Sequence, residues 1–194
     1  LIQSRQMAER IKKLVLDILY YTKARKMEWG LYSAKEFIEN TLSIVSAGAD
    51  RHGVLLEHRL DVLTGDDFFE IDLEGLRTAL INMLENGIEA CSDDNSDRQS
   101  MISVHTRMDQ EKVLISIQDN GPGIDKESLK NIFTIFFSSK GNKGTGLGLY
   151  IANKVVGRHR GSIKAKSTLK KGTKFLIKIP RYVPETVKNP QGMI

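Results

Sequence analysis

The sequence has 194 residues, of which 40% are hydrophobic and 27% are charged, as expected for a soluble globular chain with one domain and an appendage or two small domains. The net charge of +5 is too small for the dense basic surface of a nucleic-acid-binding protein, and no apolar run approaches the roughly 18 residues of a membrane span. The single cysteine, Cys91, excludes an internal disulfide.

The first segment, from Leu1 to about Ala24, is predicted to form one long helix. Its apolar residues recur at spacings of four and three, as in a coiled-coil seam. These residues are Met7, Ile11, Leu14, Ile18 and Tyr21. We expect the stripe to pack on another chain or on sequence outside this one; a helix folded back onto its own domain is the alternative.

Residues 27–33 are expected to form a short linker. Ser33 is predicted to cap the next helix, because Glu36 follows three residues later and completes a capping box. Residues 54–60 and 68–71 then have the composition of short strands.

The helix expected from Leu73 to about Cys91 has two different sides. One side is apolar. The opposite side carries Asn82, Glu85, Asn86 and Glu89, two amides and two carboxylates without a basic residue. Such oxygen ligands suit Mg²⁺, and an ordinary polar surface is the alternative.

A β-hairpin is predicted over residues 101–106 and 113–117. It leads to D-N-G-P-G-I, which begins at Asp119. This motif could be a tight turn only. It could instead present a carboxylate at the floor of a pocket, where an adenine amine would donate to it.

A glycine-rich segment, K-G-N-K-G-T-G-L-G-L, spans residues 140–149 and precedes a predicted helix that reaches about His159. Backbone N–H groups and the positive end of a helix dipole make such a junction a natural phosphate site. A flexible surface loop is the alternative. Aromatic residues just before it predict a lid with an apolar anchor. A closing hairpin over 161–168 and 173–179 follows, and residues 181–194 are expected to be disordered.

These motifs together resemble the ATP-binding domain of sensor histidine kinases, of the GHKL or Bergerat type. The resemblance covers about residues 33–180 and rests on N-x-x-x-N-G-x-E-A, D-N-G-P-G-I, F-x-x-F-F-S-S-K, the glycine-rich segment and G-T-x-F at residue 172. It implies an α+β fold, a two-layer sandwich with a mixed sheet of about five strands on three helices. It also implies a catalytic domain over 34–180, preceded in 1–26 by the second helix of a dimerisation and phosphotransfer domain.

Applied residue by residue, the resemblance implies a site for ATP and Mg²⁺. Asn86 would bind the metal and Asn82 would support it. Asp119 would accept from adenine. The remaining implied contacts are Gly121, Gly123 and Ile124 at the base, Phe136 in the lid, Thr173 behind the adenine, and Lys140, Lys143, Gly144, Thr145, Gly146, Leu147 and Gly148 at the phosphates.

In the family, the γ-phosphoryl group of ATP passes to a histidine and then to an aspartate of a response regulator. The resemblance therefore implies a response regulator and a homodimer as partners, with no nucleic acid, in a cytoplasmic domain whose parent could be membrane-anchored. One departure is that Glu89 and Ala90 stand where many members have a lysine and an aromatic residue. Lys140 and Lys143 would then carry more of the phosphate contact.

The phosphate-accepting histidine is the larger departure. The four histidines are His52, His58, His105 and His159; none lies on the first predicted helix and none is followed by an acidic residue. We expect the accepting helix to be absent from this chain, which should bind ATP without phosphorylating itself.

Two other functions compete with the kinase. ATPases of the wider superfamily place a glutamate base at the position of Asn82, so this chain lacks their base. Serine kinases of the anti-sigma type lack a dimerisation helix, which argues against that function here.

Overall fold

The computed structural model describes residues 26–63, 65–92, 98–138 and 144–183. The expected first helix, Lys140 and Lys143 lie outside these ranges. No helix within them is long and apolar enough to cross a membrane.

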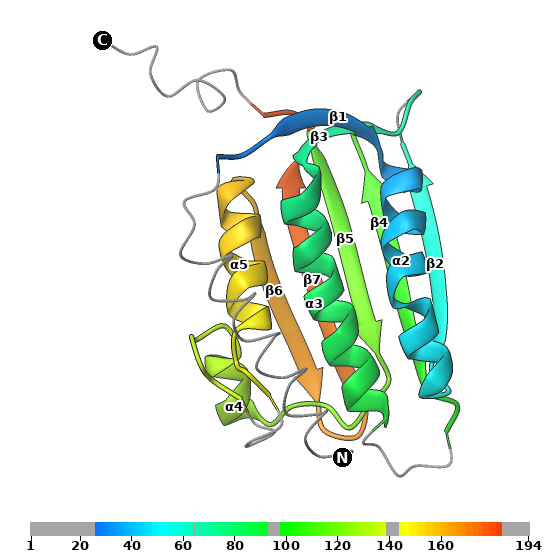
Figure 1. Ribbon diagram of the computed structural model, residues 1–194, viewed down its shortest axis with the longest axis vertical. Coiled ribbons are helices and arrows are strands. Elements are labelled where there is room, and N and C mark those ends of the chain that lie inside the picture. The colour runs from blue at the N-terminus through cyan, green and yellow to red at the C-terminus, as the bar shows by residue number, and fades with distance from the viewer. Residues whose placement is uncertain (1–25, 64, 93–97, 139–143, 184–194) are drawn as a thin grey trace, which may run out of the picture.

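The described chain folds into two layers, a sheet and a set of helices on one of its faces (Figure 1). The elements in chain order are β1 (Trp29–Ser33), α2 (Ala34–Arg51), β2 (Leu55–Val62), β3 (Phe68–Asp72), α3 (Leu73–Ser92), β4 (Met101–Met108), β5 (Lys112–Asp119), α4 (Lys126–Asn131), α5 (Gly148–Arg158), β6 (Ser162–Thr168) and β7 (Gly172–Pro180).

Five strands form the main sheet in the order β2-β4-β5-β7-β6. The β2–β4 pair is parallel and the other pairs are antiparallel, so the sheet is mixed. Helices α2, α3 and α5 lie side by side across one face (Figure 1). The predicted α+β sandwich of about five strands on three helices is confirmed.

Alternation along the strands explains why the helices cover only one face. The inward residues of β4, β5 and β7 are buried and, apart from Thr106, Thr173 and Asp119, apolar, while their neighbours in sequence point to the other face. Burying each Ile, Val or Phe contributes roughly 1.5–3 kcal/mol. The inward set is Ile102, Val104, Met108, Val113, Ile115, Ile117, Phe175, Ile177 and Ile179.

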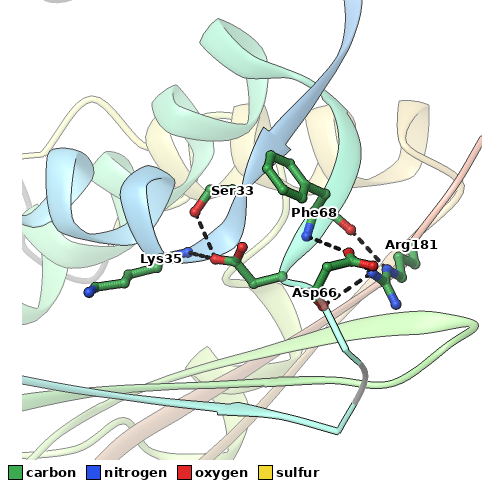
Figure 2. A network of polar contacts seen from close by, with 6 residues as sticks. Ser33, Lys35, Asp66, Phe68 and Arg181 are labelled. Atoms are coloured by element: carbon green, nitrogen blue, oxygen red, sulfur yellow. Dashed lines mark hydrogen bonds and ion pairs between the residues drawn. The ribbon is translucent and has the colours of Figure 1, made fainter.

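The start of α2 confirms Ser33 as its cap. The Ser33 hydroxyl accepts from the Glu36 N–H over 3.2 Å and donates to Asp67 Oδ2 over 2.7 Å. The same Asp67 oxygen accepts from the Lys35 N–H over 3.0 Å (Figure 2). The loop before β3 therefore supplies a second cap that sequence reasoning missed.

The linker expected over 27–33 is instead largely a strand. Trp29–Ser33 forms β1 and pairs antiparallel with β3 in a separate two-stranded ribbon. The Trp29 ring packs edge-on against the His159 ring, with 5.2 Å between centroids. Pairing with β3 and this ring contact fix a segment whose sequence is too short and irregular to predict a strand.

Residues 181–183 were expected to belong to a disordered tail but are folded; the rest of that expected tail lies outside the described residues. Arg181 and Val183 are buried. The Arg181 guanidinium donates to the Phe68 carbonyl over 2.8 Å and pairs with Asp66, as Figure 2 shows. Val183 donates its N–H to Glu70 over 3.0 Å. Contacts with β3 and the loop before it therefore extend the folded part to at least Val183.

Candidate functional site

The polar side of α3 faces α5 at Asn82. Asn82 is 7% exposed, and a Cβ added to Gly148 would lie 3.2 Å from Asn82 Oδ1. A side chain at residue 148 would therefore crowd the amide. Asn86 lies one turn further along α3 and is half-buried. The structure thus brings the asparagine motif and the glycine-rich motif together.

Asn82 also has an unsatisfied buried donor. Its Nδ2 atom has no hydrogen-bond partner among the described residues. A buried polar group without a partner costs about 1–3 kcal/mol, so such a group usually serves a ligand or another functional need.

The first turn of α5 has no side-chain cap. Leu147 stands at the cap position, and its apolar side chain has no atom that could accept a hydrogen bond. Thr145 Oγ1 accepts from the Leu147 N–H over 3.3 Å, in the turn before the helix. The positive end of α5 therefore suits an anion beside Asn82.

Asp119 ends β5 and is buried. Its Oδ1 atom accepts from the N–H groups of Gly121 and Thr173, each over 3.0 Å. These two bonds fix the plane of the carboxylate. Gly87, which belongs to the asparagine motif but was given no role there, allows α3 to approach this residue, because a Cβ there would meet Ile102 at 3.0 Å and Asp119 at 3.6 Å.

The glycines around Asp119 allow backbone segments to pack together. Gly123 has φ +75°, and a Cβ there would lie 2.2 Å from the Thr168 carbonyl oxygen. Gly172 has φ +94°, and a Cβ there would lie 2.0 Å from the Asp119 carbonyl oxygen. The D-N-G-P-G turn and the β6–β7 turn are therefore one packed unit.

Ser167 connects this unit and was missed in the sequence. Its hydroxyl donates to the Gly172 carbonyl over 3.0 Å and accepts from the Ile124 N–H over 2.8 Å. It also lies 2.9 Å from Thr173 Oγ1. Because the serine proton is used on the carbonyl, the threonine hydroxyl is the donor in that pair and its oxygen keeps its acceptor capacity. The only sign of this role in the sequence is that Ser167 places a hydroxyl where the alternation of β6, at Ile163 and Ala165, otherwise places apolar side chains.

The aromatic segment lies against the glycine-rich segment. Phe136 has φ +64° and is 65% exposed, and its N–H donates to the Gly146 carbonyl over 3.1 Å. Gly146 has φ +67°, and a Cβ there would lie 2.4 Å from the Phe136 carbonyl carbon. A Cβ added to Gly144 would likewise lie 2.5 Å from the Ser138 hydroxyl oxygen. Phe133, by contrast, packs edge-on against Phe175 in the core.

The four histidines do not form part of this arrangement. His52, His58 and His105 are exposed, and His105 contacts Asp61 over 2.8 Å. His159 is buried, where Nδ1 contacts the Val155 carbonyl over 2.8 Å and Nε2 accepts from the Asp72 N–H over 3.1 Å. Burial lowers the pKa of His159. Its two bonds require the neutral ring with the proton on Nδ1.

A cluster of three or more His, Cys, Asp or Glu side chains able to hold a metal ion is not found within the described ranges. The oxygen donors here are the amide of Asn86 and the neighbouring carboxylates of α3. Such a set fits Mg²⁺, which keeps several waters and shares phosphate oxygens. It does not fit a metal held by protein alone.

Residues 71–183 match the model of a family described as histidine kinase-, DNA gyrase B-, and HSP90-like ATPase. The chain is 30% identical over 189 residues to the signal transduction histidine-protein kinase AtoS of Escherichia coli, covering 95% of this chain and 28% of the relative. It is 32% identical over 187 residues to the sensor histidine kinase ZraS of Escherichia coli O157:H7, covering 95% of this chain and 38% of the relative. The chain therefore spans well under half the length of these curated relatives.

Two solved structures have the same fold. The nucleotide-free catalytic domain of histidine kinase ThkA superposes with a TM-score of 0.68 at 26% identity, covering 81% of this chain and 100% of that domain. The complex of ThkA with the response regulator protein TrrA gives a TM-score of 0.73 at 26% identity, covering 90% of this chain and 48% of the kinase.

Proposed function

This chain belongs to the histidine kinase-, DNA gyrase B-, and HSP90-like ATPase family, and it contains the ATP-binding catalytic domain of a sensor histidine kinase. From that premise, we propose how its residues bind ATP and transfer phosphate. The observation that carries the proposal is the buried, unpaired Nδ2 of Asn82 beside the uncapped start of α5. A phosphate at that junction would satisfy both features.

Adenine recognition is assigned to Asp119. Its Oδ1 atom is held by two backbone N–H groups, so the carboxylate is fixed in orientation before any ligand arrives. A fixed acceptor loses little freedom when an exocyclic amine donates to it. Gly121, Gly123 and Ile124 would shape the surface under the base, and Thr173 would lie behind it.

Phosphate binding is assigned to the residues around the start of α5. Gly146 and Gly148 allow close backbone approach, and Thr145 and Leu147 lie in the turn that leads into the helix. Gly144, Lys140 and Lys143 would complete the set, with both lysines supplying charge. Phe136, exposed next to Gly146, would cover the bound nucleotide.

Mg²⁺ is assigned to Asn86, with Asn82 supporting it one helical turn earlier. When bound, the ion would neutralise charge on the phosphates during transfer. Asn86 would orient it through the amide oxygen. The side chains of this site would otherwise position the reactants, which is the main protein contribution to phosphoryl transfer.

The phosphoryl acceptor is assigned to a histidine outside this sequence. His159 is buried with both ring nitrogens engaged. His52, His58 and His105 lie at the end of α2, on β2 and on β4, outside the motifs assigned to the nucleotide. We assign residues 1–26 to a dimerisation helix, residues 34–180 to the catalytic domain, and a response regulator to the final transfer. The ThkA complex with its response regulator supports that partner class.

Incubation with γ-labelled ATP and Mg²⁺ tests this function, with label on protein and free phosphate followed together. The chain alone should give neither above background. Adding a separate histidine-bearing dimerisation domain should give acid-labile label on that domain. Steady release of phosphate without label would contradict the kinase assignment in favour of hydrolysis, and acid-labile label on the chain itself would contradict the external acceptor.

A further inference from the structure

The face of the main sheet opposite the helices is strongly basic over β6 and β7. Lys164 and Lys166 on β6, and Lys174 and Lys178 on β7, alternate with inward residues and are exposed. Among the described elements, no helix or strand covers this face (Figure 1). We call these four residues the lysine patch.

Cross-strand register brings the four charges close together. Lys166 pairs directly with Lys174, and Lys164 and Lys178 stand opposite Leu176 and Ser162. Strand geometry places all four within a strip of about 14 Å by 5 Å. Neighbouring charges in the strip are about 5–8 Å apart, within the Debye length of about 8–10 Å in ordinary salt, so they act on a ligand together.

The patch is not neutralised by nearby carboxylates. Within the described part of the chain, no ion pair involves any of its four lysines. The acidic residue Asp61 lies on the far strand β2, where it contacts Arg59 and His105 over 2.8 Å each. The excess positive charge is therefore concentrated on the β6–β7 half of the face.

Protection of a sheet edge does not account for the patch. Lysines on an edge strand discourage pairing with another chain, which could explain Lys164 and Lys166 on β6. Strand β7, however, is hydrogen-bonded on both sides, to β5 and β6. Lys174 and Lys178 therefore protect no edge, and the direct Lys166–Lys174 pair is itself repulsive.

We propose that the lysine patch docks this domain on the surface of an anionic lipid bilayer. Lysine ammonium groups are compact charges that attract anionic headgroups additively. Leu176, at 37% exposed between the lysines, and Leu169, at 58% exposed in the β6–β7 turn, supply apolar side chains that can enter the headgroup region.

Other macromolecules fit the patch less well. Single-stranded nucleic acid is held by aromatic side chains on which bases stack, and the outward residues of β6 and β7 include none. Protein interfaces are depleted in lysine and enriched in aromatic residues, methionine and arginine. A flat lysine surface with interspersed leucines matches a bilayer better than either.

The patch ends at a pocket of about 330 Å³ between the ends of β5, β6 and β7. Its basic lining residues are Lys112, Arg160 and Lys178, and its acidic one is Glu111. Lys112 also pairs with Asp109 over 3.6 Å. Lys178 belongs to both the pocket and the patch, so a lipid phosphate in the pocket would lie in line with headgroups under the strands.

Vesicle co-sedimentation of the 194-residue chain tests the proposal. Wild type should bind vesicles of phosphatidylglycerol and phosphatidylcholine, should not bind phosphatidylcholine alone, and should be released by high salt. The double variant Lys164→Gln/Lys178→Gln should bind roughly 30-fold more weakly. Its thermal midpoint and ATP affinity should be unchanged, since neither residue belongs to the nucleotide site.

The matched control is Lys26→Gln/Lys35→Gln, which removes the same charge from exposed residues outside the sheet. It should bind vesicles like wild type, and residues 1–25 are common to all three proteins. Three results would each overturn the proposal: wild type fails to bind vesicles, both double variants lose binding equally, or the protein binds single-stranded RNA in place of vesicles. ATP affinity is measured separately, so this outcome is independent of the nucleotide site.

Discussion

The backbone N–H of Thr173 donates to Oδ1 of Asp119 over 3.0 Å, although 54 positions separate the two residues in the chain. Gly121 donates to the same oxygen over 3.0 Å. One carboxylate therefore joins β5, the turn after it and β7. It is both a structural acceptor and the residue proposed to bind adenine, and two substitutions can separate these roles.

Asp119→Asn should weaken adenine-nucleotide binding and leave the fold nearly intact. The amide oxygen can still accept from Gly121 and Thr173, but the amide nitrogen would face the adenine amine as a second donor. Asp119→Ala should lose binding and also stability, by about 2–5 kcal/mol, because two buried N–H groups lose their acceptor. Calorimetry with ATP and urea unfolding measure the two effects. Unchanged affinity in Asp119→Asn would exclude the adenine assignment.

Asn86→Ala should weaken ATP binding only when Mg²⁺ is present, because the amide oxygen is proposed to reach the nucleotide through the ion. Titrations with Mg²⁺ and with EDTA measure the difference. Asn40→Ala is the control, since it removes the same amide from an exposed position on α2. An equal loss of affinity with EDTA would show that Asn86 contacts the nucleotide or holds the fold without the metal.

Gly146→Ala should reduce ATP affinity and stability together. The residue has φ +67°, and the new Cβ would overlap the Phe136 backbone at 2.4 Å, so the aromatic and glycine-rich segments must separate. The control is Gly157→Ala in α5, where nothing lies within 4 Å of the added Cβ. That change should stabilise the domain by up to about 1 kcal/mol through helix propensity. Thermal unfolding of both variants, with and without ATP, measures the two effects. Equal midpoints and equal shifts on adding ATP in Gly146→Ala and Gly157→Ala would contradict the packing argument.

Stability should fall as the pH drops below about 6.5, the ordinary pKa of histidine in an unfolded chain. Burial lowers the pKa of His159 in the folded domain, against smaller opposing effects of its bond to Val155 and the charge of Asp72. The unfolded chain then binds a proton that the folded one does not. The contribution is complete above about pH 6.5 and is lost as the pH falls through the lowered folded-state pKa.

Urea unfolding of wild type and His159→Gln across this pH range measures the effect. The variant should show a shallower loss of stability on acidification, because it has no proton to gain at this site. His52→Gln, at an exposed position, should retain the wild-type slope. A wild-type slope in His159→Gln would assign the acid sensitivity to other groups.

Local patterns were sufficient for most elements of the fold. Alternation predicted β4, β5, β6 and β7, and the capping box predicted the start of α2, because each depends on residues within one segment. Strand β1 was missed because five residues around Trp29 have too little pattern of their own. Its pairing with β3 and contact with His159 are long-range and cannot be read from local sequence.

The site motifs were recognised, but the reasons for several residues were not. Gly123 and Gly172 were visible as turn residues, yet their near contacts with Thr168 and Asp119 appear only when two turns pack together. Ser167 gave only the weak signal of an inward hydroxyl. Asn82 was expected on the polar side of its helix, but its burial could not be predicted, because it depends on α5 lying against α3 at that point.

Strand β3 ends at Asp72 and α3 begins at Leu73, with no loop between them. The two-stranded ribbon of β1 and β3 is therefore joined directly to α3. Ten residues of helix, about 15 Å, separate this junction from Asn82. A displacement of β1, which pairs with β3 along its length, would therefore be transmitted to α3 and to Asn82 without an intervening loop.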